Sequence, residues 1–169
     1  TYEQVKALPE FGGILNDNVI LIDIDNTDQA EIFLNMVESE NINSVLIRTG
    51  RRIHAYFKNT DVLNNKTATF TAVGITADMK RGNNSYGILK LDGKERTILR
   101  NSETVDILPK WLTPIKANIN FFSMGEGDGR NQELFNYILV LQSQGFTKEE
   151  IRETIRLINK YILKKPLSN

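Results

Sequence analysis

The sequence predicts an α+β fold, in which a largely antiparallel sheet is followed by a small helical domain. Short runs of β-branched and aromatic residues are separated by turn signals, of which Asp92-Gly93 between two alternating strands is the clearest. Two segments near the carboxyl end instead repeat apolar residues at helical spacing. We therefore expect a sheet-based domain over residues 1–122 and a helical module over residues 123–169.

The first expected unit is a strand followed by a helix. An apolar strand over residues 19–25 runs into Asn26 and Thr27, either of which can cap a helix. The helix itself is indicated by apolar residues at helical spacing, namely Ile32, Phe33, Met36 and Val37.

A hairpin is expected next, with strands over residues 44–47 and 51–57 joined at Thr49-Gly50. Side chains alternate along a strand, so every second residue of the return strand faces the same side. One face then carries Arg52, His54 and Tyr56, and the other carries Ile53, Ala55 and Phe57.

The central part of the chain is expected to be extended. Residues 67–79 are rich in Thr, Val, Ile and Phe and predict one extended segment that ends at Asp78. Strands over residues 86–91 and 95–99 then form a hairpin around Asp92-Gly93. Asp92 is therefore interpreted as a turn residue and not as a chemical group.

Two amphipathic helices are expected after a glycine-rich loop over residues 123–129. The first presents Leu134, Ile138 and Leu141 on one face and ends at Gly145. The second begins at a capping box formed by Thr147 and Glu150. Its apolar face is made by Ile151, Ile155, Ile158 and Ile162.

Composition limits the possible functions. The content of 40% hydrophobic and 25% charged residues is typical of a globular protein. Basic and acidic residues number 21 each, so net charge gives no argument for a nucleic-acid partner. The absence of cysteine excludes disulfides, thiolate metal sites and a catalytic thiol, leaving carboxylates and the single His54. No segment is apolar over the roughly 20 residues of a membrane span, so we expect no membrane partner and a cytoplasmic protein.

The strongest chemical feature is a pair of aspartates at the end of the first apolar strand. Because side chains alternate, Asp23 and Asp25 project together while Ile22 and Ile24 point into the core. Neighbouring carboxylates repel and need a cation, a basic side chain or a raised pKa to coexist. The pair indicates a divalent-metal site, and the alternative is a strand that ends in a polar, capped turn.

Two further segments can meet this pair. One carries Arg52 and His54, and the other places Asp78 and Lys80 on one face. Three carboxylates can hold two hard cations such as Mg²⁺ or Mn²⁺. Two such metal ions side by side favour in-line displacement at phosphorus. Basic side chains would neutralise a triphosphate, and His54 would donate a hydrogen bond to it. This combination predicts phosphoryl or nucleotidyl transfer.

These residues also have purely structural interpretations. A lone histidine on a strand can serve as a structural hydrogen-bonding group. Arg51 and Arg52 beside a tight turn can form a solvated surface. Asp78 can cap the turn at residues 82–84.

The order of three motifs resembles the catalytic core of the archaeo-eukaryotic primase superfamily, particularly the primase-polymerases of phages and plasmids. The motifs are Leu-Ile-Asp-Ile-Asp at residues 21–25, Gly-Arg-Arg-Ile-His-Ala-Tyr-Phe at residues 50–57 and Ile-Thr-Ala-Asp at residues 75–78. The stretch from Gly129-Arg130-Asn131 onward resembles the helical module that follows such cores.

The resemblance implies an RRM-like catalytic core in which Asp23, Asp25 and Asp78 are catalytic and hold Mg²⁺ or Mn²⁺. It also implies that His54 contacts the phosphates of the incoming nucleotide, with Lys80 nearby. The position two before the histidine is usually small in the family and is arginine here. Nucleotide contacts near the turn are therefore expected from Thr49, Arg51 or Arg52.

The function so implied is template-directed nucleotidyl transfer by a DNA primase or DNA polymerase in phage or plasmid replication. Its partners would be a single-stranded DNA template, a primer, nucleoside triphosphates and a helicase, in the cytoplasm of a bacterial or archaeal host. Two alternatives stay open. One is a metal-dependent nuclease or replication initiator, although a nicking initiator normally needs a histidine pair and only His54 is present. The other is a catalytically silent module that binds single-stranded DNA.

Overall fold

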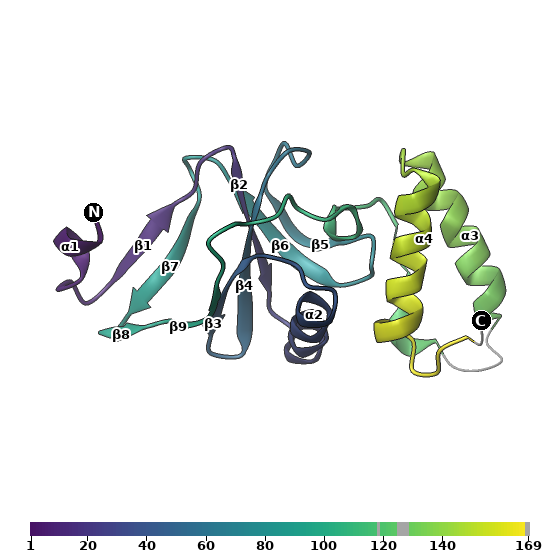
Figure 1. Cartoon of the computed structure of the whole chain (residues 1–169), viewed down its shortest axis with the longest axis horizontal. Helices are drawn as coiled ribbons and strands as arrows, with labels where there is room; N and C mark the ends of the chain where they lie inside the picture. The colour runs from purple at the N-terminus through teal and green to yellow at the C-terminus, as the bar shows by residue number, and fades with distance from the viewer. Residues whose placement is uncertain (118, 125–128, 168–169) are drawn as a thin grey trace.

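The computed structural model describes residues 1–117, 119–124 and 129–167. These residues form an α+β arrangement, as the sequence predicts, but with two antiparallel sheets and not one. Figure 1 shows the smaller sheet and the amino terminus at one end, the larger sheet in the middle, and the carboxyl-terminal helices at the other end. No helix in this described part of the chain combines the length and the apolar character needed to cross a membrane.

The larger sheet has six strands in the order β5-β6-β2-β4-β3-β9, and all neighbouring pairs are antiparallel. In chain order these strands are β2 (Val19–Ile24), β3 (Val45–Thr49), β4 (Arg52–Lys58), β5 (Lys66–Phe70), β6 (Thr76–Arg81) and β9 (Thr97–Asn101). The smaller sheet has the order β1-β7-β8, formed by β1 (Phe11–Ile14), β7 (Tyr86–Leu91) and β8 (Lys94–Glu95).

The helices flank these sheets. They are α1 (Tyr2–Val5), α2 (Thr27–Ser39), α3 (Arg130–Ser143) and α4 (Lys148–Leu157), together with the short turns η1 (Lys110–Leu112), η2 (Phe121–Ser123) and η3 (Ile158–Ile162). Helix α2 begins at Asn26, whose side chain accepts a hydrogen bond from the Gln29 N–H at 3.0 Å. This confirms the predicted cap and turns the chain sharply after β2.

One face of the larger sheet forms the main core. The apolar residues of β2 that alternate with Asp23, namely Ile20, Ile22 and Ile24, have no exposed surface. They belong to one buried cluster with Phe33 and Met36 of α2. Burial of such side chains contributes about 1.5–3 kcal/mol each to folding. The core therefore fixes which face of β2 is free for chemistry.

The prediction of one extended segment over residues 67–79 was wrong. The chain instead turns between β5 and β6, where the Thr71 N–H donates to the Ile75 carbonyl oxygen at 3.0 Å. Gly74 adopts a positive φ of 93° in this turn, which a residue with a side chain rarely does. A glycine inside an otherwise β-branched run was the signal for the turn.

The two predicted hairpin turns are present. Gly50 has a φ of 72° between β3 and β4, and Asp92 and Gly93 have φ values of 49° and 74° between β7 and β8. Two consecutive positive φ values suit the twist of a tight hairpin. The strand expected over residues 95–99 is divided, however. Residues 94–95 pair with β7 as β8, and the chain then continues as β9, which pairs with β3.

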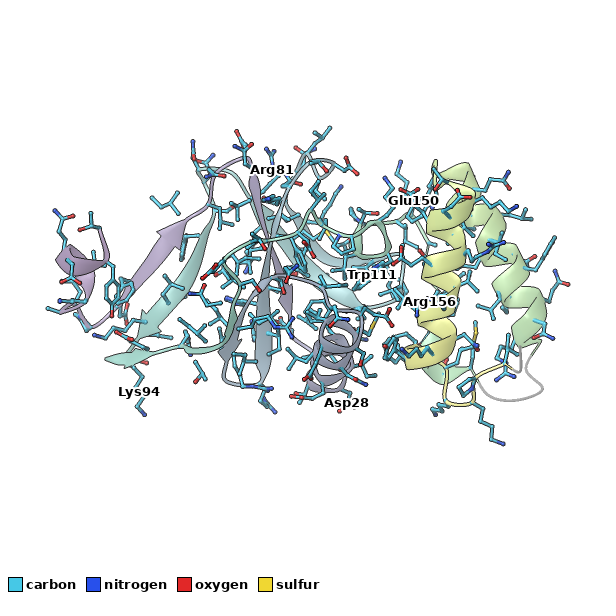
Figure 2. All side chains as sticks on the ribbon, in the orientation of Figure 1. Asp28, Arg81, Lys94, Trp111, Glu150 and Arg156 are labelled. Atoms are coloured by element: carbon cyan, nitrogen blue, oxygen red, sulfur yellow. The ribbon has the colours of Figure 1, made fainter. Side chains whose placement is uncertain are left out.

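The carboxyl-terminal helices pack against the same buried cluster as the larger sheet. Tyr137 of α3 has no exposed surface and donates its hydroxyl hydrogen to the Ala72 carbonyl oxygen at 2.5 Å. Figure 2 shows Trp111 between the sheet and α4, and this side chain is 2% exposed.

The predicted stop at Gly145 is confirmed by its φ of 82°. The predicted boundary between residues 122 and 123 stays a prediction.

Details of the predicted helices differ from the structure. In α3, Tyr137 takes the buried position that the sequence assigned to Ile138. The capping box of Thr147 and Glu150 at the start of α4 is confirmed. Of the loop predicted over residues 123–129, residues 125–128 lie outside the described residues.

A second contact joins the helices to the larger sheet through the end of α2. The Glu40 carboxylate accepts hydrogen bonds from Arg156 at 2.7 Å, from the Tyr161 hydroxyl at 2.7 Å and from Lys160 at 3.1 Å. Arg156 leads these contacts in lowering the pKa of Glu40 to about 2. Glu40 therefore stays ionised and links α2 to α4 and η3.

Candidate functional site

Three predicted site residues form a row across neighbouring strands. Asp23 of β2 is paired directly with His54 of β4 on one side and with Asp78 of β6 on the other. Directly paired residues of antiparallel strands present their side chains on the same face. The row therefore lies on the face of the sheet opposite α2, because the alternating residues Ile22 and Ile24 are buried in the core.

Asp23 is the most buried carboxylate of the row, with 3% of its surface exposed. Its Oδ2 atom accepts a hydrogen bond from Lys80 Nζ at 2.8 Å, and its Oδ1 atom lies 3.4 Å from His54 Nε2. Within the described part of the chain, Oδ1 has no hydrogen bond. Burial raises the pKa of Asp23, but His54 and Lys80 together hold this pKa well below its usual range. Asp23 is consequently an anion whose Oδ2 atom contacts Lys80 and whose Oδ1 atom faces His54.

His54 is also buried, at 8% exposure, and lies beside Asp23. Its ring meets Tyr56 edge to face, with centroids 6.5 Å apart. No hydrogen-bond partner for the buried Nδ1 atom exists among the residues that the structure describes. A structural histidine is normally hydrogen-bonded through a ring nitrogen. The other ring nitrogen, Nε2, faces Asp23, and the role of His54 stays a prediction.

Asp25 lies at the end of β2, one pleat beyond Asp23. Its side chain is 56% exposed and pairs with Arg52 at 2.9 Å. Burial and the charges of Asp23 and Asp78 raise the pKa of Asp25, although Arg52 opposes this. The three carboxylates thus influence one another electrostatically, while Asp25 itself lines a small polar hollow that adjoins the main cleft.

Asp78 does not cap the turn after β6, which was the structural alternative for this residue. Its Oδ1 atom instead accepts a hydrogen bond from the Ala68 N–H of β5 at 2.7 Å. Ala68 has a positive φ of 45° there, so the edge strand bends toward the carboxylate. Asp78 is therefore held in place by backbone and remains on the face that carries Asp23.

The row forms part of the lining of a cleft of about 500 Å³. Four cationic side chains line it, from Arg52, Lys66, Lys80 and Arg96. The carboxylates among its lining residues are Asp23 and Asp78, so cations outnumber anions. Thr49 lines both this cleft and the adjoining hollow, and Arg51 lines the hollow alone. A cleft with this charge balance suits a ligand that carries several negative charges.

Sequence reasoning missed Lys66 and Arg96 as members of this cleft. Lys66 reaches it because the turn at Gly74 folds β5 back beside β6, with a shift in register between Lys66 and Thr69. Recognition of Gly74 as a turn residue would have placed Lys66 there. Arg96 reaches the cleft only because the smaller sheet packs over the larger one, and the sequence carries no signal for that packing.

The carboxylates fit a hard divalent cation in their chemistry but are engaged elsewhere. Asp23 contacts Lys80, Asp25 contacts Arg52, and Asp78 contacts the backbone of β5. As placed, no three Asp, Glu, His or Cys side chains in the described ranges form a metal-binding group. Carboxylate oxygens are nevertheless the ligands that Mg²⁺ and Mn²⁺ prefer. Metal binding by Asp23, Asp25 and Asp78 stays a prediction.

Comparisons of the chain with protein-family models, with curated proteins and with solved structures find no match. The resemblance to the primase superfamily therefore depends on three short motifs and their order in the sequence. The structure adds the spatial relation of those motifs, because β4 and β6 are the two direct neighbours of β2.

Proposed function

We propose that this protein is a template-directed nucleotidyltransferase, a DNA primase or DNA polymerase of the archaeo-eukaryotic primase superfamily that acts in phage or plasmid replication. One observation carries the proposal: the residues Asp23, His54 and Asp78, which come from three separate motifs, lie in one row in a cationic cleft. Phosphoryl-transfer enzymes depend mainly on positioning and charge neutralisation, and this cleft supplies both.

The fold supports the same proposal. Strands β6, β2, β4 and β3 are neighbours in an antiparallel sheet, and α2 connects β2 to β3 and packs on one face. An RRM-like core has such a sheet, with its helices on one face and the opposite face free for nucleic acid or nucleotide. The cleft lies on that opposite face here.

The residues would divide the work as follows. Asp23, Asp25 and Asp78 would hold Mg²⁺ or Mn²⁺, ions that stabilise charge on the attacking and leaving oxygens at phosphorus. Lys80 and His54 keep Asp23 ionised and lie beside it. The same two side chains, with the cationic residues Arg51 and Arg52 and the hydroxyl of Thr49, would bind the triphosphate. Template, primer and a helicase would be the macromolecular partners, in the cytoplasm of a bacterial or archaeal host.

A primer-extension assay tests the proposal. The protein is incubated with a primed single-stranded DNA template, labelled nucleoside triphosphates and Mn²⁺, and Asp23→Asn is compared with the wild type. Asp92→Asn is the matched control, because it makes the same chemical change in an exposed turn where Asn also accepts a positive φ.

Growth of the primer in the wild type and in Asp92→Asn, but not in Asp23→Asn, supports nucleotidyl transfer. Cleavage of the template without growth identifies the nuclease or replication-initiator alternative. Binding of the template without either reaction identifies a catalytically silent single-strand-binding module.

A further inference from the structure

Strand β7 separates the cationic cleft from a second, apolar cavity. Tyr86 and Ile88 of this strand line the cleft, whereas Gly87 and Leu89 line a cavity of about 610 Å³ on its other side. This alternation is that of a strand with two different faces. A Cβ atom at Gly87 would lie 2.1 Å from the Tyr56 hydroxyl oxygen, so β7 packs tightly on β4 at this point. The wall that β7 presents to the cleft is therefore fixed in position.

One end of the cleft is cationic. Arg52 is paired with Thr49 of β3 at this end, and both residues line the cleft. Arg96 also lines a smaller neighbouring pocket together with Ile47 of β3, which places it on the same side of the sheet order. Among the described residues, the buried Nε atom of Arg96 has no hydrogen bond. This end therefore offers guanidinium groups to phosphate oxygens.

The other end of the cleft carries Tyr86 of β7 and one cationic side chain, Lys66 of β5. Tyr86 follows Ser85, whose hydroxyl oxygen accepts a hydrogen bond from the side-chain amide of Asn65 at 2.7 Å. Asn65 directly precedes β5, at the edge of the sheet farthest from β3. The row of Asp23, on β2, lies between the two ends. The two arginines of the lining therefore lie on one side of Asp23, and its tyrosine lies on the other.

Tyr86 is unusual in its exposure. Its side chain is 61% exposed although it lines the cleft, and within the described residues its ring takes part in no aromatic contact. Exposed tyrosines at the rim of basic grooves are the groups on which nucleobases stack in proteins that bind single nucleotides or strands. Half-buried Ile88, one pleat further along β7, extends the same wall with apolar surface.

From this arrangement we propose that Tyr86 is the residue on which the base of the incoming nucleoside triphosphate stacks, while the triphosphate extends past Asp23 to the cationic end. The inference rests on the proposed function and goes further, because it assigns the two ends of the cleft to the two parts of the substrate. Stacking tolerates every base, so Tyr86 would contribute affinity and position but no sequence preference.

Two ligands distinguish the contributions that the two ends of the cleft make to binding. Affinities for a nucleoside triphosphate and for inorganic tripolyphosphate are measured by calorimetry with Mg²⁺ present, for the wild type, Tyr86→Ala, Tyr86→Phe and Phe135→Ala. Phe135 is the matched control because it is 56% exposed on α3, away from the cleft. We expect Tyr86→Ala to lose about tenfold in affinity for the nucleoside triphosphate and none for tripolyphosphate. Tyr86→Phe and Phe135→Ala should retain both affinities.

Equal loss of affinity for both ligands in Tyr86→Ala, or loss for neither, would overturn the assignment of Tyr86. A second readout uses 2-aminopurine, whose fluorescence is quenched by stacking. Quenching by wild type but not by Tyr86→Ala should occur with the 2-aminopurine triphosphate. If Tyr86-dependent quenching occurs only with a single strand that contains 2-aminopurine, the ring serves the template and the assignment is wrong. Tyr86-dependent binding without primer extension would leave this inference standing while the proposed function fails.

Discussion

The two faces of the larger sheet use the same strands for opposite purposes. Toward α2, residues such as Ile22 and Ile53 have no exposed surface and join one apolar cluster. On the other face, alternating with them, lie Asp23 and His54, which are buried but polar. The difference shows how a period of two lets each strand supply core packing with one set of side chains and the polar lining of a cleft with the other.

The faces also differ in how completely their groups are satisfied. On the cleft face, Asp23 Oδ1 and His54 Nδ1 are buried without hydrogen bonds to any described residue. Each such group costs about 1–3 kcal/mol of stability. On the α2 face, the corresponding residues of β2 and β4, such as Ile22 and Ile53, are apolar.

The largest effect should come from the charge of Asp23. In Asp23→Asn the side chain keeps its shape but loses the anion that contacts Lys80, so primer extension should fall at least about hundredfold. The far-ultraviolet circular dichroism spectrum should not change, because the α2 face is untouched. Primer extension at the wild-type rate would show that the cleft face is not the reactive one.

A substitution at the neighbouring residue Ile22 should lower stability and leave activity unchanged. Ile22→Ala removes buried apolar surface next to Asp23 in the chain, on the α2 face. The free energy of unfolding, measured by urea denaturation, should fall by about 2–5 kcal/mol. Primer extension per folded molecule should stay near that of the wild type. A selective loss of activity without a loss of stability would contradict the assignment of stability to the α2 face and of activity to the cleft face.

His54→Ala should act on nucleotide binding more than on turnover. The imidazole lies beside Asp23 and would contact the triphosphate, so its loss should raise the apparent KM for nucleoside triphosphate about tenfold. Steady-state primer extension over a range of triphosphate concentrations measures this. An unchanged KM with a lower kcat would mean that His54 acts on the reaction step and not on binding.

The smallest effect concerns Glu40, which lies outside the cleft. Glu40→Gln should lower the free energy of unfolding at pH 7 by about 1 kcal/mol, because a neutral amide replaces the carboxylate that Arg156 and Lys160 contact. The pKa of Glu40 is lowered from 4.5 to about 2 in the folded protein. The advantage of the wild type should therefore be complete above about pH 4.5 and should disappear as pH falls toward 2. A difference independent of pH over this range would contradict the role of the charge.

Much of the fold followed from local rules in the sequence. The cap at Asn26, the turns at Gly50 and Asp92-Gly93 and the stop at Gly145 are set by residues within a few positions, and all are present. The turn at Gly74 was missed because the β-branched residues around it favour an extended chain. Propensity thus outweighed the single glycine in the prediction, whereas the chain follows the glycine.

The site was predictable where it depends on alternation and not where it depends on packing between sheets. Asp23, His54 and Asp78 share a face, and the alternation of side chains along each strand predicts which face each residue takes. The contribution of Arg96 depends on how the smaller sheet lies on the larger one, a contact between segments distant in the chain. No local pattern encodes such a contact.

The central claim is that the carboxylates beside His54 bind the divalent cation together with the nucleotide. Because His54 is the only histidine, its imidazole proton signals are isolated in a nuclear magnetic resonance spectrum. Small additions of Mn²⁺ to the protein with a non-hydrolysable nucleoside triphosphate should broaden these signals first, whereas Mg²⁺ should leave them sharp and Asp23→Asn should prevent the broadening. If the His54 signals stay sharp while signals elsewhere broaden, the cation binds at another place and the account is contradicted.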